Sequence, residues 1–223
     1  MSADELGPLL AEQVAYYRAR AAEYDATSPV GADDTSRETL VEALKAFRPA
    51  GRVVEFACGT GEWTATLAEQ ASELTAIDSS PEMLAIAAGR VQADRLRFVQ
   101  ADIFDWRPDG HYDVAFFGAW LSHVPPQWFD RFWRLVGDCL DPAGRVFFID
   151  ELPAVQAYEQ AIPGAVAPAV ERRLASGACY RTVKVFHEPA ELERRLAALG
   201  WTIGVHPVGW RFFYATGHRL SST

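Results

Sequence analysis

Short apolar runs alternate with amphipathic segments through most of the chain. Each run is apolar at nearly every position, which indicates strands buried on both faces, whereas the segments between them carry apolar residues at helical spacing. Buried strands joined by helices form a parallel sheet with helices on both faces, so the predicted fold class is α/β, doubly wound. The expected strands are residues 51–57, 73–78, 96–102, 112–120 and 143–151, and the helices between them are 62–70, 81–91 and 126–140.

The pattern changes near the end of the chain. Residues 189–200 predict a helix that ends at Gly200, and residues 201–208 and 211–217 predict two strands joined through Gly209. Two short strands with a glycine between them are typical of an antiparallel hairpin. We therefore expect the last strand to run against the others.

Two segments do not follow the strand and helix alternation. Residues 9–26 predict an amphipathic helix before the first strand, and a long stretch follows the fifth strand. Either segment is suited to cover the carboxyl edge of the sheet, where ligands bind in this architecture. We expect a single domain over residues 1–223, with a lid helix in residues 1–30 and a substrate-covering insertion in residues 153–187.

Charge and composition narrow the class of partner. The 223 residues carry a formal net charge of −9, which argues against binding to nucleic acid or to an anionic membrane surface. No apolar run is long enough to span a bilayer, and the first residues lack the features of a signal peptide. We expect a cytoplasmic protein that acts on a small molecule, with no nucleic acid or membrane partner; the sequence does not predict its oligomeric state.

No residue pattern predicts a metal site. The three cysteines, Cys58, Cys139 and Cys179, are too scattered for a disulfide framework or a zinc site. The histidines that show no metal-ligand spacing are His111, His187, His206 and His218. We expect no bound metal.

The stretch "VVEFACGTGEW", residues 53–63, predicts a strand that breaks into a glycine-containing turn before a helix. Such a turn brings backbone N–H groups and a helix N-terminus close to a ligand. The dinucleotide fingerprint G-x-G-x-x-G is a poor match, because its three glycine positions hold Ala57, Gly59 and Glu62. Glu55 lies inside the apolar strand and needs a partner there, either a cationic part of a cofactor or backbone N–H groups of the loop.

Two further carboxylates follow strand ends. Asp78 ends the second strand, where a carboxylate can accept hydrogen bonds from both hydroxyls of a ribose. Asp102 ends the third strand and can accept from an exocyclic amine while Ile103 and Phe104 flank a base, or it can cap the turn. The ordered set of these residues with the glycine turn points to a nucleoside-containing cofactor.

Five segments, "VVEFACGTGEWT", "LTAIDSSPEML", "VQADIFDW", "YDVAFFGAWLSHVP" and "LDPAGRVFFID", resemble in order and spacing the motifs of class I S-adenosylmethionine-dependent methyltransferases. The resemblance implies a seven-stranded Rossmann-like sheet whose last strand is antiparallel, which agrees with the hairpin above. It also implies S-adenosyl-L-methionine as cofactor and S-adenosyl-L-homocysteine as product. The loop from Glu55 to Gly61 would hold the methionine part, Asp78 the ribose, and Asp102 with Ile103 the adenine.

The cofactor site has one departure from the family and one addition. Ala57 stands where the family usually has glycine, and its methyl group fits if the backbone angle is ordinary. Tyr17 and Tyr24 share one face of the N-terminal helix, so they either close over the cofactor, as related enzymes imply, or only pack. The expected cofactor-binding residues are Tyr17, Tyr24, Glu55, Ala57, Gly59, Thr60, Gly61, Trp63, Asp78, Ser79, Met83, Asp102, Ile103, Phe104 and Ala119.

The segments "YYRARAAEYDAT", "AWLSHVP" and "YRTVKVFHEPAELERRLAALGW" more specifically resemble the phosphonate O-methyltransferase of dehydrophos biosynthesis and its relatives. This resemblance implies an anionic acceptor. The relatives often have arginine where this chain has Ala178, which leaves the expected anion site with one donor fewer.

Arg172, Arg173, Arg181 and Lys184 form a local concentration of positive charge in an acidic chain. If residues 180–186 form a strand, Arg181 and Lys184 lie on opposite faces, and only a bend or an edge position lets them meet on one ligand. They either bind an anion or are solvated charges that protect an edge strand; the resemblance favours the anion. The expected substrate-binding residues are Tyr16, Trp120, Arg172, Arg181 and Lys184.

His123 follows the fourth strand and is either a general base or an anchor of the turn before Pro125. An ionised phosphonate or carboxylate oxygen needs no base, whereas a phenol or a protonated amine does. The candidate catalytic residues are His123, Arg181 and Lys184. We expect a methyltransferase that methylates a phosphonate or carboxylate in natural-product biosynthesis; the alternatives are O- or N-methylation of a neutral aromatic molecule with His123 as base, and a cofactor-binding module without turnover.

Overall fold

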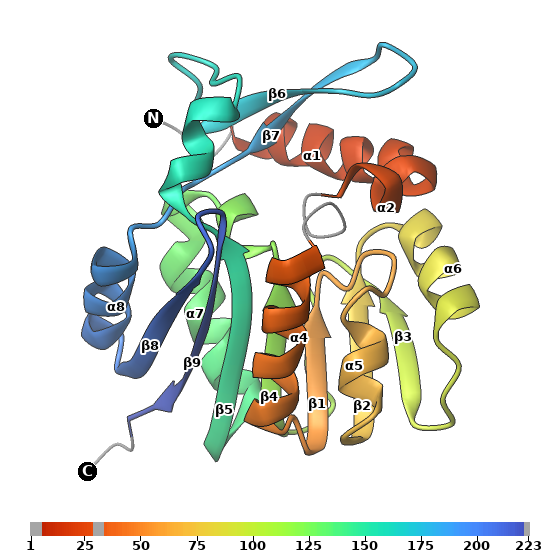
Figure 1. Cartoon of the computed structure of the whole chain (residues 1–223), viewed down its shortest axis with the longest axis vertical. Helices are drawn as coiled ribbons and strands as arrows, with labels where there is room; N and C mark the ends of the chain where they lie inside the picture. The colour runs from red at the N-terminus through yellow and green to blue at the C-terminus, as the bar shows by residue number, and fades with distance from the viewer. Residues whose placement is uncertain (1–5, 29–33, 221–223) are drawn as a thin grey trace.

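A seven-stranded sheet forms the centre of the computed structural model, which describes residues 6–28 and 34–220 (Figure 1). Its strands are β1 (Gly51–Phe56), β2 (Ala71–Asp78), β3 (Leu96–Gln100), β4 (Tyr112–Gly118), β5 (Leu140–Glu151), β8 (Trp201–Val208) and β9 (Phe212–Arg219). Their order is β3-β2-β1-β4-β5-β9-β8, with β1 to β5 parallel and β9 antiparallel to both of its neighbours. The predicted α/β class and the antiparallel last strand are confirmed.

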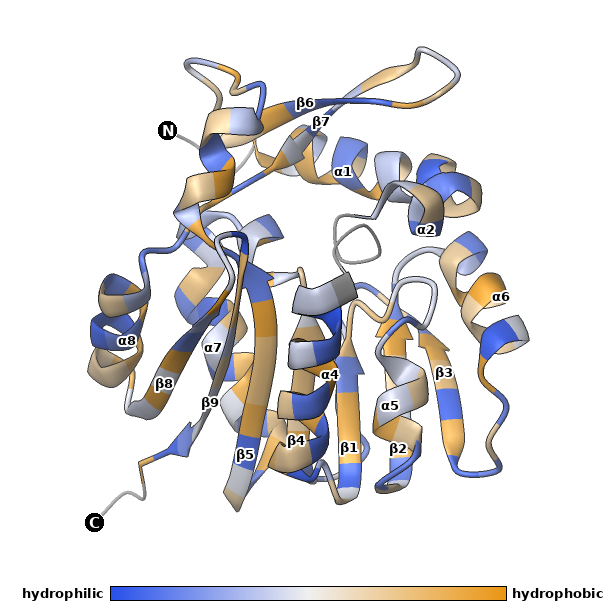
Figure 2. Ribbon diagram, in the orientation of Figure 1, coloured by the Kyte–Doolittle hydropathy of each residue, from blue (hydrophilic) through white to orange (hydrophobic). Residues whose placement is uncertain are grey.

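Helices cover both faces of this sheet. The helices are α4 (Asp34–Phe47), α5 (Thr64–Ala68), α6 (Pro81–Arg90), α7 (Phe129–Cys139) and α8 (Pro189–Ala198). Helices α4 and α5 pack on one face and α7 and α8 on the other, while α6 lies along β2 and β3 (Figure 1). Figure 2 shows that the strands are mostly hydrophobic and that the helices combine hydrophobic and hydrophilic residues, as expected for elements with one buried side.

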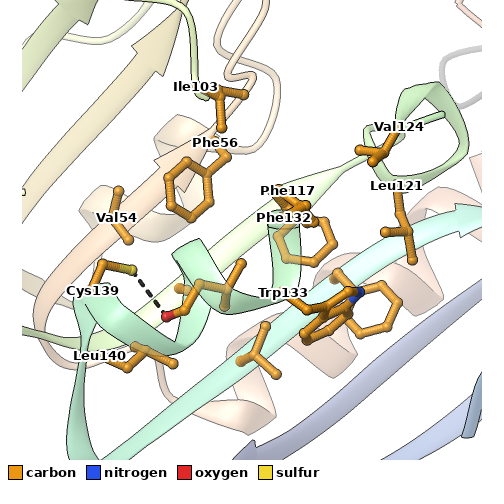
Figure 3. Packing of buried hydrophobic residues seen from close by; sticks show 14 of the residues in the cluster. Val54, Phe56, Ile103, Phe117, Leu121, Val124, Phe132, Trp133, Cys139 and Leu140 are labelled. Atoms are coloured by element: carbon orange, nitrogen blue, oxygen red, sulfur yellow. Dashed lines mark hydrogen bonds between the residues drawn. The ribbon is translucent and has the colours of Figure 1, made fainter. Parts of the chain in front are cut away.

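The strand residues alternate between two hydrophobic cores. Val54 and Phe56 belong to the core beneath α7 and α8, whereas the adjacent Val53 belongs to the core beneath α4 and α5. In the first core the rings of Phe117 and Phe132 lie edge to face with centroids 5.1 Å apart (Figure 3). Because both faces are covered, the strands show the continuous apolar runs seen in the sequence.

A roof of two separate segments lies over the carboxyl edge of the sheet (Figure 1). One segment comprises α1 (Leu6–Arg20), a 3-10 turn (Ala21–Glu23) and α2 (Tyr24–Thr27), and the other is the hairpin of β6 (Ala169–Arg173) and β7 (Cys179–Val183). The side chain of Gln13 joins them, because its Oε1 accepts a hydrogen bond from the Val183 N–H at 2.9 Å. The roof therefore joins residues that are far apart in the chain.

The structure corrects several predicted boundaries. The expected helix over residues 9–26 begins at Leu6 and is interrupted by the 3-10 turn, and the helix expected over 62–70 covers only α5. The strand expected over residues 180–186 ends at Val183 and pairs with β6. Helix α4 was not predicted. Residues 1–5, 29 and 30 of the expected lid lie outside the described residues.

No helix in the described ranges combines the length and the hydropathy needed to cross a bilayer.

Candidate functional site

The turn after β1 has a backbone that favours glycine at alternate positions. Ala57, Gly59 and Gly61 have φ values of 53°, 54° and 80°. At Gly61 an added Cβ would lie 3.1 Å from the Cβ of Ala87 on α6, so the missing side chain lets α6 approach the turn. From the sequence, the methyl group of Ala57 was expected to fit if the backbone angle there is ordinary. The φ of Ala57 instead lies in the left-handed region, which strains a residue that has a Cβ.

Glu55 lies beneath this turn and is almost completely buried, with 1% of its surface exposed. Its Oε2 accepts a hydrogen bond from the Thr64 hydroxyl at 2.6 Å. Burial raises the pKa of Glu55 to about 8, against the opposing effect of the Thr64 bond. Its partner is thus a side chain of the following helix, not a loop N–H, and Glu55 lines neither cavity described below.

Asp78 ends β2 and holds two turns together. Its carboxylate accepts hydrogen bonds from the Gly59 N–H and the Ser80 N–H, each at 2.9 Å. Burial raises the pKa of Asp78, partly offset by these bonds. Asp102 accepts similarly from the Phe104 N–H at 2.8 Å, which is the turn cap considered from the sequence.

A first cavity lies between these strand ends and α1. Leu10, Gln13 and Val14 of α1 form part of its wall, so the N-terminal helix covers it. The predicted cofactor residues on its wall are Tyr17, Tyr24, Ala57, Gly59, Asp78, Ser79, Met83, Asp102, Ile103, Phe104 and Ala119. Eleven predicted residues from five parts of the chain therefore line one cavity. Their roles in binding a cofactor stay predictions.

A second cavity lies beside the first. Predicted cofactor residues Thr60 and Trp63 line this second cavity, whereas Gly61 lines neither. Both cavities share the wall residues Tyr17, Tyr24, Ala57, Gly59, Gly118, Ala119 and His123. The two cavities therefore adjoin at these residues.

Three cations line the second cavity, namely Arg20, Arg172 and Lys184. Arg172 donates two hydrogen bonds to the Glu159 carboxylate, at 2.5 and 2.8 Å. The guanidinium of Arg20 lies 4.6 Å from the ring centroid of Tyr24. Lys184 is buried and donates to Glu151. The predicted substrate residues Arg172 and Lys184 therefore face one space.

Arg181 lies elsewhere, which corrects the prediction that it shares a ligand with Lys184. Its side chain is 53% exposed and pairs with Glu12 of α1 at 2.7 Å. It lines neither cavity. The cause is the alternation of side chains along β7, with no bend that turns Arg181 inward.

The two aromatic substrate candidates differ in position. Tyr16 is buried against Tyr17 and Tyr180 and lines neither cavity, so the structure gives it a packing position. Trp120 lines the first cavity and packs against Phe132. The buried Nε1 of Trp120 has no hydrogen-bond partner among the described residues.

Both ring nitrogens of His123 are engaged. Nδ1 lies 2.7 Å from the Val183 carbonyl oxygen, which can only accept, so Nδ1 carries the proton. Nε2 lies 2.8 Å from the Tyr17 hydroxyl and therefore accepts from it. Burial, reinforced by the charges of Lys184 and Arg172, lowers the pKa of His123 well below its usual value. The geometry is that of a neutral anchor between the two parts of the roof.

Among residues 6–28 and 34–220, no three His, Cys, Asp or Glu side chains form a cluster that could hold a metal ion.

Sequence reasoning gave no site role to four polar residues on the cavity walls, Gln13, Ser28, Glu62 and Glu151. Arg20 stands one helical turn after Tyr16 and Tyr17, where the sequence favours a basic partner for the carboxylate of the cofactor, and its side chain lines the second cavity. Glu151 follows Asp150 at the end of an apolar strand, and charges in such a place need partners. Nothing local marks Gln13.

Comparison with known proteins gives a consistent family. Residues 53–144 match the model of a methyltransferase domain. The structure is similar to DhpI in complex with SAH, with a TM-score of 0.84 and 42% identity over 96% of this chain and 98% of that chain. It is similar to DhpI in complex with SAM and HEP, with a TM-score of 0.83 and 42% identity over 94% and 97% of the two chains.

A further known protein matches only part of this chain. Trans-aconitate 2-methyltransferase of Deinococcus radiodurans is 40% identical over 98 residues, which are 42% of this chain and 37% of that protein. The match thus spans well under half of either protein.

Proposed function

The chain belongs to the class I S-adenosylmethionine-dependent methyltransferases, and we propose that it methylates an oxygen atom of a small phosphonate or carboxylate. The first cavity would hold the cofactor and the second the acceptor. The observation that carries the proposal is the excess of positive charge on the wall of the second cavity, where Arg20, Arg172 and Lys184 stand against two carboxylates, Glu62 and Glu151, in a chain of net charge −9.

The residues of the first cavity fit the cofactor chemically. Asp78 and Asp102 place carboxylates at neighbouring strand ends, where one would accept from ribose hydroxyls and the other from the adenine amine. Apolar Ile103 and Met83 supply walls for a base. S-adenosylmethionine supplies an electrophilic methyl group, and the protein has to align the acceptor with it.

The shared wall is where the two ligands would meet. Tyr17 and Tyr24 border both cavities from the lid, and Ala57 and Ala119 border both from the sheet. Two bulky rings there exclude water from the line of transfer. Excluding water strengthens the attraction between the cations and an anionic acceptor.

The proton chemistry also favours an anionic acceptor. A phosphonate or carboxylate oxygen is ionised near neutral pH, so the enzyme needs no general base. His123 is a weak base in this setting, because its pKa is lowered and its Nε2 already accepts from Tyr17. Methylation of a neutral phenol by His123 is therefore less well supported.

We favour a phosphonate over a carboxylate because the two similar proteins match different shares of this chain. The DhpI complex that contains HEP matches nearly the whole chain, including the roof, whereas the trans-aconitate enzyme matches 42% of it. The resemblance to the dehydrophos phosphonate O-methyltransferase supports a place in natural-product biosynthesis.

Phosphorus NMR tests the proposal. The enzyme is incubated with S-adenosylmethionine and alkyl- or hydroxyalkyl-phosphonates, and release of S-adenosylhomocysteine is followed in parallel with trans-aconitate and with phenols. A new phosphonate monoester signal is expected. Turnover confined to phenols would overturn the proposal.

A matched pair of arginine variants tests the site itself. Arg172→Ala should raise the acceptor KM about tenfold or more, because it removes a charge-assisted contact. Arg181→Ala removes the same charge from the neighbouring strand, outside both cavities, and should leave KM near the wild-type value. Affinity for S-adenosylhomocysteine should change in neither variant.

A further inference from the structure

We propose that Glu151 is a positioning residue that keeps Lys184 protonated and directs its ammonium group toward the acceptor. The proposal rests on the proposed function, since it concerns the same anion site. It assigns a role to a carboxylate that lines an anion-binding cavity, where a negative charge is otherwise unfavourable.

Lys184 is held by β5 and by the turn that follows β4. Its Nζ donates to Oε2 of Glu151 at 2.8 Å and to the Ser122 hydroxyl at 3.0 Å. Its side chain is 2% exposed, so these partners replace water. Asp150 lies 4.0 Å away, beyond hydrogen-bond distance.

One N–H of the ammonium group is left for a ligand. An ammonium group has three donors, and two of them point to Glu151 and Ser122. Among the described residues no third acceptor lies within reach, and Lys184 lines the second cavity. An oxyanion in that cavity would accept the third hydrogen bond of the Lys184 ammonium group.

Glu151 is itself fixed from the other side. Its Oε1 accepts from Nε of Arg211 at 3.0 Å and pairs with the other guanidinium nitrogen at 2.8 Å. Although burial alone would raise the pKa of Glu151, the pairs with Lys184 and Arg211 outweigh it and lower that pKa. The carboxylate is therefore ionised at neutral pH and cannot turn away from Lys184.

Asp150 cannot substitute for it. The Asp150 carboxylate already accepts from the backbone N–H groups of Ser122 and Glu151, each at 2.8 Å. The first bond directs Oδ2 to the turn that carries His123, and the second ties Oδ1 to the backbone of β5. Asp150 therefore holds the turn, whereas Glu151 holds Lys184.

Asp150, 4.0 Å from Nζ, and the Phe186 ring, whose centroid lies 5.1 Å from Nζ, also favour the charge of Lys184, without a hydrogen bond to it, whereas the remaining groups that face it do not. His123 on the turn is neutral, and His187 lies close enough for the ammonium to lower its pKa. Arg172 lines the same cavity and repels a second cation. Without the charge of Glu151, burial and this repulsion favour the neutral amine, which binds an oxyanion weakly.

The sequence makes Lys184 directly observable. The chain contains two lysines, Lys45 and Lys184. Selective labelling of lysine with ¹³C at Cε therefore gives two NMR signals, and Lys45→Arg identifies which belongs to Lys184. The probe ligand for equilibrium binding is methylphosphonate.

The test variant is Glu151→Gln, which keeps the shape and removes the charge. Lys184 should lose its proton at a lower pH than in the wild type, and the acceptor KM should rise about tenfold between about pH 7 and 9, with kcat little changed. In the wild type KM should be nearly flat over that range. Glu73→Gln removes an exposed carboxylate at the opposite edge of the sheet and should behave as wild type.

Glu151→Asp separates charge from packing. It keeps the negative charge on a shorter side chain, so it should retain most of the flat KM profile. Far-ultraviolet circular dichroism and binding of S-adenosylhomocysteine establish that each variant is folded.

Parallel pH profiles of KM in Glu151→Gln and wild type, with Lys184 titrating at the same pH, would overturn the proposal. If no anionic acceptor is methylated, the proposed function fails, whereas the NMR titration and methylphosphonate binding still decide whether Glu151 controls Lys184.

Discussion

The Tyr17 hydroxyl donates a hydrogen bond to Nε2 of His123 across 2.8 Å, and this bond joins the lid helix to the 3-10 turn (Leu121–His123) that follows β4. The rings also meet edge to face, with centroids 5.4 Å apart. In the neutral ring Nε2 accepts from the Tyr17 hydroxyl, whereas in a protonated ring Nε2 would donate to the hydroxyl oxygen and the hydroxyl proton would need another acceptor. The protonation of one side chain therefore affects how the roof is held.

His123 makes stability depend on pH in a defined direction. Its folded pKa lies well below the ordinary value of 6.5, so the unfolded chain binds the proton first. The stabilisation is fully present above about pH 6.5 and is lost as the pH falls, by at most about 1.4 kcal/mol per pH unit. Urea unfolding between about pH 7 and 5 should therefore show a shallower decline in His123→Gln, and equal slopes would contradict this. Exposed His111→Gln is the control.

Glu55 has the opposite dependence. Its folded pKa of about 8 exceeds the ordinary value of 4.5, so the folded protein keeps a proton that the unfolded chain releases. The resulting loss of stability grows as the pH rises from 4.5 toward 8. Glu55→Gln should thus be more stable than the wild type near neutral pH, by on the order of 3 kcal/mol, and less so in acid. A gain independent of pH would show that Glu55 is ionised when folded.

Asp78 should determine cofactor affinity. Asp78→Asn replaces one acceptor by a donor opposite the Gly59 or Ser80 N–H and removes a carboxylate from the cavity wall. Calorimetry with S-adenosylhomocysteine should show a dissociation constant raised about tenfold or more. Asp94→Asn, in an exposed turn, provides the comparison. Unchanged affinity would remove Asp78 from the cofactor site.

Replacement of Ala57 by glycine should not destabilise the folded protein and should stabilise it if the relief of strain is the larger effect. Its φ of 53° costs a residue with a Cβ about 1 kcal/mol, which glycine avoids, partly offset by the greater freedom of glycine in the unfolded chain. Thermal unfolding of Ala57→Gly should show a melting temperature equal to or above that of the wild type. Ala197→Gly in α8 should lower it, because helical glycine is unfavourable. A clear loss in Ala57→Gly would mean that the methyl group packs usefully.

The pair of Arg181 with Glu12 should matter little for stability. Both side chains are partly solvated, and exposed ion pairs contribute about 1 kcal/mol or less. The Glu12 carboxylate also accepts from the Arg181 backbone N–H, which Arg181→Ala retains. Urea unfolding should place the variant within about 1 kcal/mol of the wild type. A larger loss would show that α1 docking depends on this pair.

The sheet could be predicted from the sequence because burial on both faces leaves a continuous apolar pattern, as at Val53 and Val54. Helix α4 was missed although Leu40 and Leu44 have helical spacing, since charged residues surround them. The carboxylates at Asp78 and Asp102 were found because strand ends in a parallel sheet meet at one edge.

The arrangement of the cations could not be predicted. Arg172 and Arg181 stand close together in the sequence, yet their partners are Glu159 and Glu12, and the second of these is 169 residues away. Which arginine faces the cavity depends on the pairing of β6 with β7 and on the docking of α1. The left-handed angle of Ala57 was likewise invisible, because alanine gives no sign of a positive φ.

The Gln13 and Val183 contact also bears on how the protein is made. These residues are 170 positions apart, so the lid helix emerges from the ribosome long before the strand on which it docks. Contacts of such separation carry the highest loop-closure entropy and form late in folding. The nascent chain can complete its sheet through β5 while the first cavity stays open. The bond between Gln13 and Val183 can then hold the lid helix only after β7 has been synthesised and placed.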